Sequence, residues 1–280
     1  MRYGFWTKLA FINFLFLVAL ACQSQTAPNS SDKINSNASS NNANGANQSN
    51  SQTKIAEPQA VKFVSEGNVE IVGTFYESPQ PNSPAVLLLH QFNSDRKSYD
   101  EFARRLQAKG FGVLAIDGRG FGESVKTTDG ASVAPARTDE AVKGMKADVG
   151  AAFGNLSEMK NVDAARIGIV GASYGSSLAI IYAAENKQIR AVALLSPGLN
   201  YFGNLPIQDA VKNYGDRNLL VVAAEDDKES ADSVKKLKSA VVNAKYETQI
   251  YPKGGHGTGI FAAKVGLEDL LEQFLTKSLQ

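Results

Sequence analysis

The sequence predicts an α/β protein in which a mostly parallel sheet lies between two layers of helices, a three-layer sandwich. Solid apolar runs such as 85–89 are typical of parallel strands buried on both faces. From residue 85 onward these runs alternate with helical patterns. The motifs that carry chemistry directly follow the predicted strands, where doubly wound sheets place their sites. Residues 61–280 are therefore expected to form one domain around a substantial core.

The elements follow from local pattern. Alternating segments at 61–64 and 69–76 flank a Gly67-Asn68 turn and predict a hairpin. The helix at 139–156 is indicated by Val142 and Met145, which begin an apolar stripe of helical spacing. The other strands are expected at 85–89, 112–116, 166–170, 189–195, 219–223 and 246–251, and the other helices at 98–109, 174–185, 207–214, 230–244 and 260–278.

Composition excludes several classes of function. Twenty-nine basic and twenty-eight acidic residues give a net charge of +1, so no global field favours nucleic acid as a partner. A single cysteine, Cys22, excludes an internal disulfide framework and a thiolate metal cluster. The two histidines, His90 and His256, leave little material for a zinc site. We expect no metal and no organic cofactor.

Residues 1–22 have the pattern of an export signal. Arg2 and Lys8 precede an uncharged run at 9–21 that is too short for a comfortable membrane span. The run ends at Cys22, and the segment resembles a bacterial lipobox. Lipid on Cys22 would hold the protein on a membrane surface of the bacterial cell envelope. Gln23 favours the outer membrane; an uncleaved anchor helix and an ordinary signal with an incidental cysteine are the alternatives.

Residues 23–60 are expected to be a disordered tether. Asn, Ser and Gln occupy twenty of the thirty-one positions in 23–53, where Ile34 is the only large apolar residue. Such a segment buries too little apolar surface to offset the entropy of ordering. It would act as a spacer between the membrane and the domain.

A candidate nucleophile, Ser173, lies in the pentapeptide Gly171-Ala172-Ser173-Tyr174-Gly175, which follows the strand at 166–170 and precedes a helix. A strand–turn–helix context is what a Gly-x-Ser-x-Gly elbow requires to expose its serine above the sheet. The alternative is a plain turn between a strand and a helix. We interpret Ser173 as a nucleophile, which needs a base.

His256 is the expected base, because it lies in a glycine-containing loop after the last strand; a capping or surface role is the alternative. The orienting acid is expected at the end of the strand at 219–223. Asp227 is favoured there, with Asp226 and Glu225 as alternatives. The chain order serine, aspartate, histidine is that of hydrolases with a nucleophile elbow.

The corner His90-Gln91-Phe92 follows the strand at 85–89 and is expected to help form an oxyanion hole. One backbone N–H would come from Tyr174, directly after the nucleophile. The other would come from Phe92, with Gln91 as the alternative. His90 is then expected to brace the corner rather than to act on substrate.

With these motifs the domain resembles the α/β-hydrolase superfamily, in its dienelactone-hydrolase-like and prolyl-oligopeptidase-like branch. The matching segments are the elbow at 171–175, the corner at 90–92, the loop at 117–124, the acid turn at Asp227 and the loop at 255–257. Three residues depart from the family pattern: Gln91 and Ala224 stand where glycine is usual, and Ser173 stands where dienelactone hydrolases carry cysteine.

The resemblance implies a serine hydrolase that cleaves small-molecule esters through an acyl-enzyme, as a carboxylesterase or thioesterase would. A peptidase and a catalytically inactive surface-anchored binding module are the alternatives. Because 197–206 is expected to be only a short connection, no cap domain is predicted, and the site should be open. Its expected lining is Phe92, Tyr174, Tyr201, Phe202 and the loop at 125–138, while Asp117 is expected to be structural. Neither the substrate nor the oligomeric state follows from the sequence.

Overall fold

The computed structural model describes residues 55–241 and 245–280, which lie in a compact unit spanning Ser51–Gln280. The predicted export signal, Cys22 and most of the predicted tether lie outside the described residues. Within the described ranges no helix is both long and apolar enough to cross a membrane.

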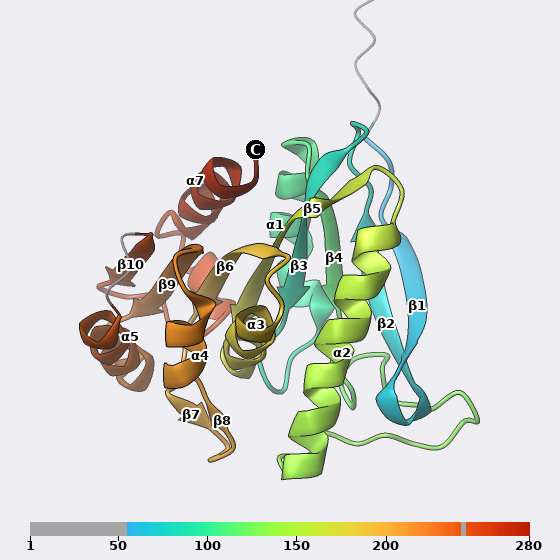
Figure 1. The fold of residues 1–280 in the computed structure, drawn as a ribbon, viewed down its shortest axis with the longest axis horizontal. Helices are drawn as coiled ribbons and strands as arrows, with labels where there is room; N and C mark the ends of the chain where they lie inside the picture. Colours follow the sequence, from blue (N-terminus) through green and yellow to red (C-terminus); the bar gives the residue numbers. More distant parts are fainter. Residues whose placement is uncertain (1–54, 242–244) are drawn as a thin grey trace, which may run out of the picture. The chain divides into compact units, whose positions relative to one another are not determined.

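An eight-stranded sheet forms the centre of this unit, with strand order β1-β2-β4-β3-β5-β6-β9-β10 (Figure 1). The first two strands are antiparallel to their neighbours, and all the other pairs are parallel. The strands are β1 Gln59–Ser65, β2 Val69–Tyr76, β3 Ser83–Leu89, β4 Gly112–Ile116, β5 Val162–Ala172, β6 Ile189–Leu195, β9 Asn218–Ala224 and β10 Tyr246–Tyr251. The prediction of a mostly parallel sheet is confirmed.

Helices cover both faces of the sheet and complete the three layers (Figure 1). One face carries α2 Asp139–Glu158, α3 Tyr174–Glu185, α4 Gln208–Tyr214 and α5 Lys228–Ala240, whose apolar side chains share one core with that side of the sheet. The other face carries α1 Asp100–Ala108, α6 Gly259–Ala262 and α7 Leu267–Leu279, which form the second core. Every residue of β3 is buried, as its unbroken apolar sequence predicts.

The carboxyl ends of four parallel strands carry the predicted site. The corner at His90 follows β3, and the elbow at Ser173 follows β5. The acid turn at Asp227 follows β9, and the loop of His256 follows β10. Because parallel strands end at the same edge of a sheet, residues separated by up to 166 positions in the chain converge there.

The C-terminal segment differs from the expectation. A single helix was expected at 260–278, but the structure has the short α6 and then α7. Lys264 and Gly266 between them have positive φ angles of 52° and 86°, which a continuous helix does not allow. The break lets Ile260 and Leu267 both reach the core, where each is fully buried.

Two further segments depart from the expectation. The connection expected at 197–206 contains a small hairpin, β7 Asn200–Tyr201 and β8 Leu205–Pro206, joined in antiparallel register. The helix expected to run to residue 244 ends at Ala240, and 242–244 lie outside the described residues.

Candidate active site

The turn at Ser173 is held in a strained conformation. Its φ of 53° and ψ of −124° are unusual for a residue other than glycine. The Ser173 N–H donates to the Leu195 carbonyl at 2.8 Å, and the Ser173 carbonyl accepts from the N–H of Ser176 at 2.8 Å and from its Oγ at 2.5 Å. These bonds tie the backbone to β6 and to the first turn of α3. The local geometry is therefore that of a nucleophile elbow.

Two glycines allow this elbow to pack. A Cβ at Gly171 would lie 2.2 Å from the Gly175 carbonyl oxygen, and one at Gly175 would lie 2.6 Å from that of His90. Both neighbours are backbone atoms that cannot move aside without displacing a strand or a helix. The close approach of β5, α3 and the His90 corner thus requires glycine at both positions.

The structure brings Ser173, His256 and Asp227 into one hydrogen-bonded chain. His256 Nε2 lies 2.7 Å from Ser173 Oγ, and His256 Nδ1 lies 2.7 Å from Asp227 Oδ2. Ser173 is 6% exposed, whereas the His256 side chain is 42% exposed. The arrangement can transfer a proton from the hydroxyl to the imidazole while the carboxylate fixes the ring.

The other two acids of the turn have separate partners. Asp226 accepts from the N–H groups of Gly254 and Gly255 at 3.0–3.2 Å. Those backbone bonds lower the pKa of its carboxyl. Glu225 pairs with Lys235 of α5. Among the three candidates, only Asp227 contacts His256 in the described part of the chain.

Two side chains hold the loop of His256 through contacts that the sequence did not indicate. Ser196 Oγ accepts from the Gly257 N–H at 2.8 Å. Gln91 Oε1 accepts from the N–H of Thr258 at 2.7 Å and from its Oγ at 3.1 Å. Gln91 thus links the corner after β3 to the loop after β10. The sequence indicated Gln91 only as an alternative oxyanion donor and did not single out Ser196, so neither contact was predicted.

The backbone N–H groups of Phe92 and Tyr174 have no acceptor among residues 55–241 and 245–280. Tyr174 begins α3, where the first N–H groups have no partner within the helix. The ring of Phe92 packs against that of Tyr174 at a centroid distance of 5.7 Å, so the two segments are neighbours. The free donors and the helix N-terminus can accommodate negative charge.

His90 is 2% exposed and braces the corner, as expected. Its Nε2 accepts from the Gly118 N–H at 3.0 Å, and its Nδ1 lies 2.7 Å from the Gln91 carbonyl. The ring is therefore neutral, with the proton on Nδ1. Burial lowers the pKa of the imidazole.

Asp117 has the structural surroundings expected for it. Its fully buried carboxylate accepts from the Arg96 backbone and guanidinium and from the Glu123 N–H. These bonds fold the loop at 117–124 on itself and against η2 Arg96–Tyr99.

Four aromatic rings pack together beside the elbow, and Tyr174 among them is buried. We call Phe92, Tyr174, Tyr201 and Phe202 the aromatic wall. Phe202 lies 5.0 Å from Phe92, 6.1 Å from Tyr174 and 6.3 Å from Tyr201 between ring centroids. Tyr201 Oη donates to the Ser196 carbonyl at 2.8 Å, and burial raises the pKa of its phenol. The wall therefore connects the corner after β3 to the β7–β8 hairpin.

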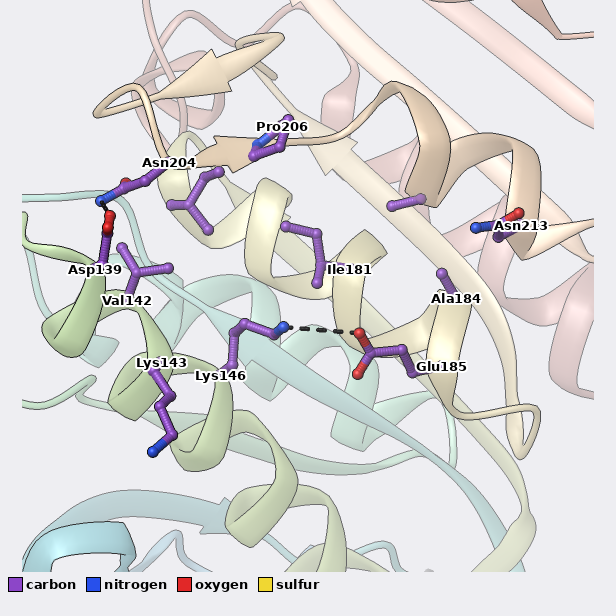
Figure 2. A pocket seen from close by; sticks show the side chains of 12 residues that line it. Asp139, Val142, Lys143, Lys146, Ile181, Ala184, Glu185, Asn204, Pro206 and Asn213 are labelled. Carbon is purple, nitrogen blue, oxygen red and sulfur yellow. Dashed lines mark hydrogen bonds and ion pairs between the residues drawn. The ribbon is translucent and has the colours of Figure 1, made fainter.

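A separate cavity of about 480 Å³ opens between α2, α3 and α4 (Figure 2). Its apolar floor includes Val142 and Ile181, and Lys146 pairs with Glu185 across it. None of the residues that line this cavity belongs to the Ser173–His256–Asp227 chain. It is therefore distinct from the candidate active site.

The fold is that of the α/β hydrolases. The family model for serine aminopeptidase, S33, matches residues 80–213, which include Ser173 but neither Asp227 nor His256. Two uncharacterized proteins of Mycobacterium tuberculosis are 34% identical over 116 residues, 41% of this chain. The match spans only 37% of those relatives' length.

Solved structures with the same fold cover most of the chain. An esterase from Pyrococcus furiosus has a TM-score of 0.65 and 18% identity over 80% of this chain and 92% of its own. Acetyl xylan esterase 1 from Thermoanaerobacterium has a TM-score of 0.66 and 19% identity over 83% and 86%. Dienelactone hydrolase from Anabaena variabilis has a TM-score of 0.59 and 18% identity over 80% and 100%.

Proposed function

We propose that this protein is a serine hydrolase that cleaves carboxylic esters or thioesters through an acyl-enzyme intermediate. The observation that carries the proposal is the hydrogen-bonded chain from Ser173 Oγ through His256 to Asp227, with both contacts at 2.7 Å. The strained elbow, the unpaired N–H groups beside it and the esterases among the structural neighbours support it.

In the first half of the reaction, Ser173 Oγ attacks the substrate carbonyl while His256 Nε2 takes the hydroxyl proton. Asp227 accepts the Nδ1–H bond, which keeps Nε2 free to accept that proton and stabilises the imidazolium. The N–H groups of Phe92 and Tyr174 would hold the oxyanion of the tetrahedral intermediate. His256 then returns the proton to the leaving alcohol or thiol as its bond to the carbonyl carbon breaks.

In the second half, a water molecule replaces the leaving group. His256 takes a proton from this water, whose oxygen attacks the acyl carbon bound to Ser173 Oγ. The second tetrahedral intermediate uses the same two N–H groups. Its collapse returns the proton to Ser173 and releases the carboxylic acid. Each step uses side chains and backbone groups of the described domain.

The experiment that tests the proposal is labelling with a fluorophosphonate probe, which reports an activated serine. We expect the wild-type protein to be labelled and Ser173→Ala to be unlabelled. Ser177→Ala, also in α3, is the matched control, because the buried Ser177 Oγ has no hydrogen-bond partner among the described residues. A folded wild-type protein that is not labelled would contradict the proposal and favour a binding module.

A peptidase is the second candidate, because the family model that matches residues 80–213 is described as serine aminopeptidase, S33. Hydrolysis of p-nitrophenyl acetate without hydrolysis of aminoacyl anilides would favour the esterase. The reverse preference would favour the peptidase. Both activities would use the same acyl-enzyme chemistry at Ser173.

We further propose that lipid on Cys22 anchors the protein to a membrane of the cell envelope, preferably the outer membrane. Support comes from the sequence pattern at 1–22 alone. Metabolic labelling with a palmitate analogue in a bacterial host should modify the wild-type protein and not Cys22→Ser. Equal labelling of both proteins would contradict the anchor.

A further inference from the structure

Arg137 lies against the aromatic wall of the candidate active site. Its guanidinium carbon is 4.4 Å from the centroid of the Phe92 ring and 5.0 Å from that of Phe202. Phe92 also packs against Tyr174, which directly follows Ser173. The Phe92 ring therefore contacts both the guanidinium of Arg137 and the ring of Tyr174, the residue after the nucleophile. Stacking on two rings restricts where this flexible side chain can place that charge.

The backbone of Arg137 is also held by the β7–β8 hairpin, which carries Tyr201 and Phe202 of the aromatic wall. Asn204, in the turn of the β7–β8 hairpin, donates from Nδ2 to the Arg137 carbonyl at 3.1 Å and to Asp139 Oδ1 at 2.9 Å. Figure 2 shows the Asn204 side chain directed at Asp139, at the start of α2. Thr138 caps the same helix by accepting from the Ala141 N–H. The loop before α2 and the hairpin thus meet at Arg137.

The guanidinium of Arg137 has no carboxylate partner among the described residues. Other arginines near the site are already paired: Arg96 with Asp117 and Glu123, and Arg119 with Asp148. Arg137 is also exposed to solvent, so a substrate can reach it. A guanidinium that packs on aromatic rings and has no carboxylate partner is suited to binding a carboxylate or a phosphate. It can do so through two parallel N–H···O hydrogen bonds.

From this geometry we propose that Arg137 determines specificity for esters that carry an anionic group, such as a carboxylate, at a distance from the scissile carbonyl. The aromatic wall would contact the apolar part of the substrate between the two. This inference rests on the proposed function, because it assigns a substrate class to the site of Ser173. It identifies Arg137 as a binding residue that takes no part in proton transfer.

The test compares charged and neutral esters of matched length. One pair is mono-p-nitrophenyl glutarate with p-nitrophenyl pentanoate, which places the anion on the acyl side. The other is the acetate ester of p-hydroxyphenylacetate with p-isobutylphenyl acetate, which places the anion on the leaving group. Each pair is measured with the wild type, Arg137→Met and Arg137→Lys. Arg104→Met on α1 is the control for net charge, because Arg104 is exposed and its one ion pair among the described residues is with Glu57.

We expect the wild type to prefer the anionic member of at least one pair. Arg137→Met should lower kcat/KM for that ester about 10- to 100-fold, the range for a hydrogen bond to a charged group, chiefly through KM. The neutral ester should be unaffected, and Arg137→Lys should retain part of the preference. Added salt should weaken the preference, because the contact is exposed.

The inference is overturned if the wild type is labelled by the fluorophosphonate and hydrolyses the neutral esters, but shows no anionic preference in either pair. It is also overturned if Arg137→Met slows both members of each pair equally, which would indicate a packing role on Phe92 and Phe202. Absence of both labelling and hydrolysis in the wild type would instead refute the proposed function, and the inference with it.

Discussion

Around the proposed nucleophile, each neighbouring residue restrains a different atom. Leu195 and Ser176 fix the backbone of Ser173, while His256 faces its hydroxyl. The position of His256 in turn depends on Asp227 and, through the adjacent loop residues, on Gln91. The geometry of a single hydroxyl is therefore set by residues from four separate strand ends.

The roles of the two adjacent aspartates can be separated by mutation. Asp227→Asn keeps the size of the side chain but removes the carboxylate that orients His256, so we expect kcat to fall by about 10⁴-fold, as in other serine triads. Asp226→Asn should have a far smaller effect, because Asp226 only accepts from the backbone of Gly254 and Gly255. Steady-state hydrolysis of a p-nitrophenyl ester measures both. Equal losses of kcat in the two variants would contradict the assignment of Asp227 as the residue that orients His256.

His90 should make the stability of the protein depend on pH. Burial lowers its pKa below the ordinary value of 6.5, so the folded protein binds a proton more weakly than the unfolded chain. The free energy of unfolding should therefore fall as the pH drops below about 6.5, by at most about 1.4 kcal/mol per pH unit, until the folded-state pKa is passed.

Urea unfolding of the wild type and of His90→Gln, measured from about pH 5 to about pH 8, tests this effect. This range includes the ordinary histidine pKa of about 6.5 that is expected in the unfolded chain. The difference in unfolding free energy between the two proteins should shrink as the pH falls, because the wild type loses the stability that His90 provides. A difference that is constant with pH would show that His90 does not titrate on unfolding.

Among the elements, the strand–turn–helix unit of β5 and α3 has no room for larger residues at its two glycines. Its turn passes so close to neighbouring backbone that Gly171 and Gly175 leave no room for a Cβ. By contrast, a Cβ at Gly154 within α2 meets no atom within 4 Å. The same substitution should therefore have opposite effects in the two elements.

Gly175→Ala should destabilise the protein by at least about 1–3 kcal/mol, the usual cost of overpacking, since the new methyl group meets the carbonyl oxygens of Leu89 and His90. Gly154→Ala should stabilise it by about 0.5–1 kcal/mol, because alanine is the better helix former. Thermal or urea unfolding checks both. If Gly175→Ala is as stable as the wild type, the close approach of Gly175 to the backbone of Leu89 and His90 is contradicted.

At the scale of the whole molecule, both cores and the candidate site lie within residues 55–280. The two faces of the sheet form separate clusters, and Arg105 of α1 pairs with Asp269 and Glu272 of α7 to join the helices on one of them. The Ser173–His256–Asp227 chain is built at the edge of the sheet that these cores support.

We therefore expect residues 55–280 alone to unfold at the same temperature as the full chain and to be labelled by the fluorophosphonate at the same rate. Ser173→Ala in the shorter protein is the control for specific labelling. A loss of thermal stability or of labelling on removal of residues 1–54 would show that this segment contributes to the fold or to the site.

The order and type of most elements could be predicted from local sequence, because apolar periodicity and turn residues are local properties. The sequence also placed Ser173, Asp227 and His256 after predicted strands, since parallel topology brings the carboxyl ends of strands to one edge. The break before α7 was missed, because Lys264 adopts a positive φ that its residue type does not favour.

The partner that each side chain contacts depends on the tertiary structure. Three consecutive acids follow β9, and the choice of Asp227 over Asp226 depends on the path of the His256 loop. The contacts of Gln91 with Thr258 and of Arg137 with the aromatic wall join segments far apart in the chain, and no local pattern specifies either contact. Local sequence specifies how a segment folds, whereas a contact between distant segments depends on the packing of the entire sheet and its helices.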